Sequence, residues 1–201
     1  MRKLLKFVSV MLVLYVVFWC GTVVSDRKVL NENLIRFHVV ANSDSDEDQS
    51  LKLKVRDAVV EKLQDTMESF PTMEEAKAYL QSHLPELEEF VNRVIQELGY
   101  TDTAKISVDR ETFDTREYET FSLPAGYYEA LRITIGEGKG RNWWCVVFPS
   151  LCVGKTTEDF TDTAACAGFS DTLTQTLQEE RQIRFYLLDW LGQVENFFRS
   201  L

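Results

Sequence analysis

The sequence predicts an α+β domain in which helices cover one face of a largely antiparallel sheet, preceded by an apolar N-terminal helix. Segments with apolar residues at helical spacing and short β-rich runs follow one another in the order β-α-α-β-β-β-α. The first 25 residues stand apart because a basic head precedes an uncharged run. Hydrophobic residues make up 45% of the 201 residues, which is enough for the core of one domain.

The N-terminal segment, residues 1–25, is predicted to be a signal peptide or a membrane anchor. Arg2, Lys3 and Lys6 precede "FVSVMLVLYVVFWCGTVV", an uncharged run just long enough to cross a hydrocarbon core. Cleavage ahead of Asp26 and retention of the helix both stay open. Because the basic head favours the cytoplasmic side, we expect residues 26–201 to form an extracytoplasmic domain.

The body is predicted to begin with a strand and a long helix. Residues 33–41 form a short run of β-branched and apolar side chains, which is typical of a strand. After "NSDSDEDQ", apolar residues recur at helical spacing over about five turns. Ser45, followed three residues later by Asp48, resembles a capping pair, so the acidic segment is interpreted as the start of this helix.

A second helical stretch follows. Thr72 and Glu75 form a capping box at its beginning, and Gly99 is a natural left-handed stop at its end. Pro85 should divide the stretch into two shorter helices near Leu84, because the residue before a proline avoids helical geometry.

Three strands are expected in "AKISVD", "YYEALRITIG" and "WWCVVF". The loop "GEGKGRN" between the last two contains three glycines, so we expect these two strands to form a hairpin. Residues 155–175 follow neither period and are predicted to be a loop. The chain should end in a helix that packs on the core through Ile183, Leu187, Trp190, Leu191, Val194, Phe197 and Phe198.

The charge of the chain disfavours a nucleic-acid partner. The formal net charge is −10, and since the first 25 residues contribute +3, residues 26–201 carry −13. Such a body is repelled by phosphate backbones, and no basic stripe with interleaved aromatic residues is present. The membrane is expected to be contacted through the N-terminal segment if that segment is not cleaved.

The acidic segment does not match a calcium loop. Asp44, Asp46 and Asp48 alternate as in an EF-hand, but Gln49 stands where glycine is needed and Val55 where a bidentate glutamate is needed. Two histidines without thiolates at ligand spacing do not make a zinc site. The sequence therefore predicts no metal and no cofactor.

One polar cluster leaves an enzymatic alternative open. His38, Ser43 and Asp44 lie close together in the sequence, and an exported hydrolase acting on cell-wall or peptide material would use them. No Gly-x-Ser-x-Gly elbow accompanies the serine.

Two of the four cysteines are expected to pair outside the cell. Cys145 and Cys152 are separated by "VVFPSL", in which Pro149 can turn the chain. The other reading is two buried free thiols. Cys166 would be left unpaired.

The segments "HVVANSDSDEDQSLKLKVRDAV", from His38, and "LPAGYYEALRITIGEGKGRNWWCVVFPSLC", ending at Cys152, resemble the stage II sporulation protein R family of endospore-forming bacteria. The resemblance implies an exported signalling protein rather than an enzyme. Members of this family are made in the forespore and exported into the space between forespore and mother cell. There they activate a membrane-embedded aspartic protease, which cleaves the precursor of the mother-cell factor sigma-E.

We expect the contact with this protease where polar residues cluster without a clear packing reason. The candidate partner-binding residues are Asn42, Ser43, Asp44, Asp48, Arg141, Asn142 and Trp143. Exposed tryptophan and arginine often anchor interfaces. Since adjacent strand residues face opposite sides of a sheet, Trp143 or Trp144 must also serve the core.

Overall fold

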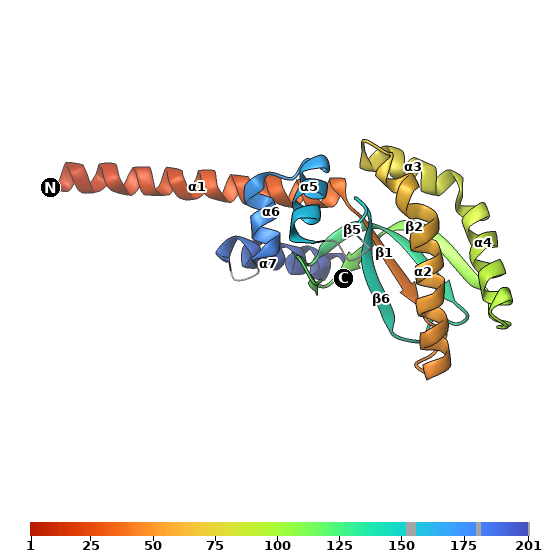
Figure 1. Cartoon of the computed structure of the whole chain (residues 1–201). Helices are drawn as coiled ribbons and strands as arrows, with labels where there is room; N and C mark the ends of the chain where they lie inside the picture. Colours follow the sequence, from red (N-terminus) through yellow and green to blue (C-terminus); the bar gives the residue numbers. More distant parts are fainter. Residues whose placement is uncertain (152–155, 180–181, 201) are drawn as a thin grey trace.

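The computed structural model describes residues 1–151, 156–179 and 182–200. An N-terminal helix, α1 (Arg2–Asn33), leads into a body built on a four-stranded sheet, and Figure 1 shows its free end extending far from that body. In spatial order the sheet consists of β2 (Ala104–Phe113), β5 (Gly126–Ile135), β1 (Ile35–Val40) and β6 (Asn142–Phe148). A separate pair is formed by β3 (Arg116–Glu117) and β4 (Ser122–Leu123).

The sheet is mixed, with the first strand of the chain in its interior. Strand β1 runs parallel to β5 and antiparallel to β6, and β2 runs antiparallel to β5. The α+β class and the largely antiparallel pairing are therefore confirmed. The predicted hairpin is wrong, because β1 lies between β5 and β6 and pairs with both. The glycine-rich loop instead crosses over the end of β1.

Three helices cover one face of the sheet: α2 (Asp46–Glu68), α3 (Met73–Ser82) and α4 (Leu84–Glu97). Their apolar stripes bury Phe37 and Val39 of β1 together with Ile133 of β5. The joint between α3 and α4 lies at His83, immediately before the predicted break, and Gly99 ends the stretch with a φ of +86°.

The other face carries a second core, so helices cover both faces of the sheet rather than the one we expected. This core joins Leu34, Tyr128 and Val146 to the last part of α1 and to the helices near the C-terminus. These helices are α5 (Thr157–Cys166), α6 (Asp171–Gln178) and α7 (Ile183–Arg199).

The prediction of a loop over residues 155–175 is wrong, apart from Lys155, which lies outside the described residues. A capping box of Thr156 and Asp159 starts α5, and the Ser170 hydroxyl caps α6. Each helix is too short for its buried residues to establish a period along the sequence.

The terminal helix is confirmed as an element, but most of its predicted core stripe faces outward. Phe185, Leu188 and Gly192 are buried, whereas Ile183 and Trp190 are 72% and 58% exposed. Gly192 decides the contact, because a Cβ at this position would collide with the carbonyl oxygen of Ala125. The glycine lets the backbone of α7 lie directly against the chain entering β5.

Candidate functional site

The two predicted polar clusters, far apart in sequence, meet at one end of the sheet. Asp44, in the turn between β1 and α2, accepts a hydrogen bond from the backbone N–H of Arg141 at 2.7 Å. The Arg141 Nε lies 3.4 Å from the same carboxylate oxygen, and both side chains are well exposed. We call the surface around Asn42, Ser43, Asp44, Asp48 and Arg141 the turn site.

Asp48 organises the interior of the turn site. Its carboxylate accepts hydrogen bonds from Ser43 Oγ at 2.5 Å and from Asn42 Nδ2 at 3.1 Å. Its backbone N–H donates to Ser45 Oγ at 3.1 Å, which confirms the predicted cap of α2. The hydrogen bond from Ser43 is the largest cause that lowers the pKa of Asp48. Burial, the second largest effect, raises this pKa, and the hydrogen bond from Asn42 adds to the lowering.

The glycine-rich loop fits closely onto this turn. Backbone N–H groups of Lys139 and Gly140 donate to the carbonyls of Asn42 and Ala41 at 3.0 and 2.9 Å. A Cβ on Gly140 would collide with the Ser43 carbonyl, so the close approach requires glycine there. The turn site is thus held by packing and hydrogen bonds that sequence reasoning did not find.

Two further residues join the turn site that were not among the predicted ones. Gln49 Nε2 donates to the Ser43 carbonyl at 2.9 Å, and the nearly buried Lys52 Nζ donates to Gln49 Oε1 at 2.6 Å and to the Arg141 carbonyl at 3.0 Å. Burial is the largest cause that lowers the pKa of Lys52. Both residues lie in the segment that carries the family resemblance, which was the available signal.

The two adjacent tryptophans of β6 face opposite sides, as expected. Trp143 packs edge-on against Phe37 at 5.8 Å, and the Arg56 guanidinium lies 4.9 Å from its ring. Trp144 stacks on His38 at 4.7 Å. Both are half-buried, so each serves a core and keeps an accessible edge. The neighbouring Asn142 is also half-buried, and its Oδ1 has no hydrogen-bond partner among the described residues.

His38 and Ser43 do not act as a pair in this structure. His38 is 2% exposed, and its Nε2 lies 3.2 Å from Glu111 Oε2. Ser43 Oγ instead donates to Asp48. The imidazole therefore packs on the face of the sheet that carries the second core, against Trp144 and Phe113, while the Ser43 hydroxyl belongs to the turn site. This arrangement separates two components of the hydrolase alternative.

Cys145 carries a free, buried thiol, whereas we expected a disulfide with Cys152. Cys152 lies outside the described residues. The Cys145 side chain belongs to the core beneath α2, while Leu151 packs in the core on the opposite face of the sheet. The disulfide stays a prediction.

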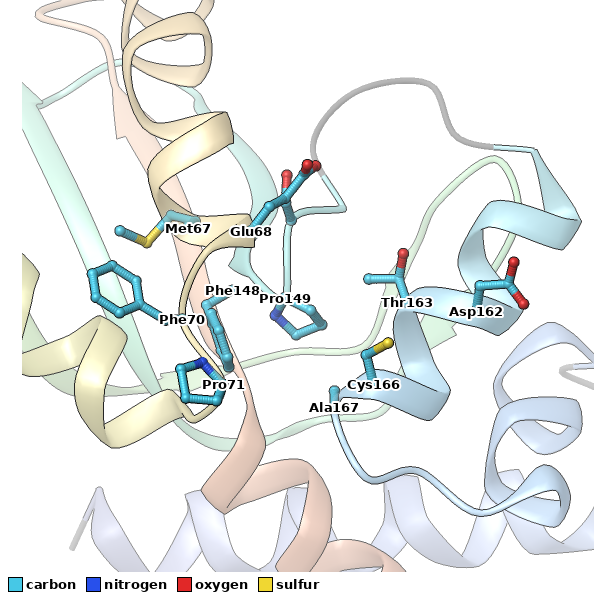
Figure 2. Close-up of a pocket in the computed structure, with 11 residues that line it drawn as sticks. Met67, Glu68, Phe70, Pro71, Phe148, Pro149, Asp162, Thr163, Cys166 and Ala167 are labelled. Atoms are coloured by element: carbon cyan, nitrogen blue, oxygen red, sulfur yellow. The ribbon is translucent and has the colours of Figure 1, made fainter.

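A groove of about 320 Å³ lies at the opposite end of β6 from the turn site. Figure 2 shows Met67, Phe70 and Phe148 on one side of the groove and Thr163 and Cys166 of α5 on the other. Its lining is mostly apolar and includes two acidic residues, Glu68 and Asp162. Among the described residues no group of three His, Cys, Asp or Glu side chains can hold a metal ion.

The fold and the turn site define an α+β protein whose apolar N-terminal helix is compatible with a signal or an anchor. Residues 31–158 match the family model described as stage II sporulation protein R. A stage II sporulation protein R from Bacillus subtilis (strain 168) is 31% identical over 186 residues, covering 83% of each chain. No solved structure matches the chain significantly.

The chain belongs to the stage II sporulation protein R family. Its role is therefore in sporulation. The matched region begins within α1 and includes the whole turn site and the sheet.

Proposed function

We propose that this protein is an exported signal that activates a membrane-embedded aspartic protease, which then processes the precursor of sigma-E. Family membership is the observation that carries the proposal. The geometry supports a ligand rather than an enzyme, since the polar side chains of the turn site satisfy one another and His38 is buried away from them. In this proposal the protein works in the space between forespore and mother cell.

We further propose that the turn site contacts the protease. Asp44 and Arg141 are exposed on a surface whose backbone is fixed by the loop-to-turn hydrogen bonds. A rigid polar surface with a half-exposed tryptophan at its border is suited to protein recognition, because little conformational entropy is lost on binding.

The test is reconstitution of the signal in a host that lacks sporulation genes. The full chain is co-expressed with the protease and the sigma-E precursor, and cleavage of the precursor is followed by immunoblot. Cleavage that depends on this protein and on its export supports the proposal. An intact precursor, with export and protease confirmed, contradicts it.

The turn site is tested in the same host with a matched pair of variants. Arg141→Ala removes an exposed cation from the turn site, and we expect a several-fold loss of cleavage. Lys139→Ala removes a cation of similar exposure from the same loop, where it pairs with Glu137 at 2.6 Å. Equal cleavage by both variants would exclude a role of Arg141 in recognition.

A further inference from the structure

The outer face of α7 is apolar although it is uncovered. Ile183, Tyr186, Trp190 and Phe197 are 72%, 61%, 58% and 61% exposed. Their spacing of three, seven and fourteen residues places them on one stripe of the helix. An exposed apolar stripe on a domain that is otherwise strongly acidic indicates a contact with another apolar surface.

This face is fixed relative to α1. Arg184 donates from Nε to the Asp26 carboxylate at 2.7 Å, and Arg27 pairs with Glu195 at 2.5 Å and donates to the Leu188 carbonyl at 3.1 Å. Figure 1 shows α7 running beside the last part of α1. Wherever α1 is placed, α7 therefore follows.

The length of α1 brings this pair of helices to the bilayer. The first α1 residue beside the body is Tyr15, which faces the start of α6 across a hollow lined also by Trp19, Thr22, Ser170, Thr172 and Arg184. The preceding part, from Arg2 to Leu14, is about 20 Å long at 1.5 Å per residue. A hydrocarbon core is about 30 Å thick, so α1 cannot span it without drawing the body to the surface.

The charges on α7 permit this contact. Its two acids, Asp189 and Glu195, point inward: Asp189 Oδ1 accepts from the Ala125 N–H at 2.8 Å, and Glu195 is paired with Arg27 and Arg199. Tyrosine and tryptophan are the residues enriched where hydrocarbon meets headgroups.

We propose that Ile183, Tyr186 and Trp190 of α7 lie in the headgroup interface of the bilayer that α1 enters, on the side of the body. The occupant of the stripe is thus lipid, and α1 and α7 together set the depth and orientation of the domain. This inference goes beyond the proposed signalling function and does not depend on the identity of the protease.

Quenching of Trp190 by brominated lipid tests the proposal. The full-length chain carrying Trp19→Phe is reconstituted into phosphatidylcholine vesicles with bromine either near the headgroup end of the acyl chains or deep within them. The emission of Trp190 is obtained by subtracting that of the Trp19→Phe, Trp190→Phe variant. We expect strong quenching by the shallow bromine and weaker quenching by the deep one.

A matched control places a tryptophan elsewhere on the surface. Leu98, at the end of α4 on the far face of the sheet, is 38% exposed, and Leu98→Trp in the doubly substituted chain should not be quenched. Equal emission of Trp190 in brominated and plain vesicles would overturn the proposal. Unquenched Trp190 together with a dimer in light scattering would assign the stripe to a second copy, and quenching of both tryptophans would indicate adsorption without orientation.

Discussion

Replacing Asp48 by alanine should destabilise the protein, because its carboxylate makes three stabilising interactions. The carboxylate accepts two hydrogen bonds, from Ser43 Oγ and Asn42 Nδ2, and lies in the first turn of α2. Hydrogen bonds to a charged group contribute about 1.5–3 kcal/mol each when buried, and an acid in the first turn adds about 0.3–1 kcal/mol. Because Asp48 is partly exposed, we expect a total loss of about 2–3 kcal/mol.

Thermal unfolding followed by circular dichroism measures this loss. For a chain of this size 1 kcal/mol corresponds to about 2–4 °C, so the midpoint should fall by about 5–10 °C. Asp46→Ala is the matched control, since Asp46 lies in the same first turn but is exposed and outside this network. A decrease no larger for Asp48→Ala than for Asp46→Ala would refute the assignment of stability to the two hydrogen bonds.

The same carboxylate sets a pH dependence with a defined sign. Its pKa in the folded protein is lowered from the ordinary value of 3.8, chiefly by the Ser43 hydrogen bond. The unfolded chain therefore binds the proton more tightly, and the stabilisation is complete above the unfolded pKa and is lost as the pH falls through the folded one. Asp48→Ala should flatten the decrease of stability in that acid range.

Three further predictions concern the cores and the thiols. Arg36 is fully buried, its guanidinium lies near the rings of Phe113 and Tyr128, and its Nε and Nη1 have no hydrogen-bond partner among the described residues. Arg36→Met should therefore change the free energy of unfolding by no more than about 1 kcal/mol, whereas Arg36→Ala, which leaves a cavity, should lower it by about 3 kcal/mol or more. Equal losses for the two variants in urea unfolding would contradict this. Gly192→Ala should lower the midpoint of thermal unfolding, because the added Cβ clashes with Ala125. Gly21→Ala has no neighbour within 4 Å, so the midpoint should stay unchanged or rise with the higher helix propensity of alanine. The opposite ranking of the two midpoints would count against the packing of α7. Alkylation of the native protein followed by mass spectrometry should label exposed Cys166 rapidly and buried Cys145 slowly, and rapid labelling of Cys145 would show that its core opens.

Local signals predicted the elements up to β6 well, whereas the caps of α5 and α6 were missed. Ser45, Thr72, Pro85 and Gly99 act through neighbouring backbone groups, and their caps, joint and stop were all found where expected. The other failures involve contacts between distant segments. The hairpin prediction assumed that consecutive strands pair, but β1 is inserted between β5 and β6, and nothing within "GEGKGRN" reports that insertion.

The buried face of α7 and the turn site show the same limit. Apolar spacing selects a stripe on α7, yet Gly192 sets the closest approach to the body and turns that stripe outward. At the turn site the candidate residues were identified by their polarity. Their mutual contacts depend on the loop that brings Arg141 to Asp44, and this was not evident from either segment alone.

The position of β1 has a consequence for how the chain would fold during the proposed export. Strand β1, residues 35–40, can pair fully only when both β5 and β6 are available, and β6 ends at Phe148. A chain that crosses the membrane with α1 leading therefore leaves its central strand unpaired until about a hundred later residues have emerged, and such non-local pairing is slow. In the proposed export, this delay would keep the polypeptide unfolded enough to pass a translocation channel, and the sheet would close only after translocation.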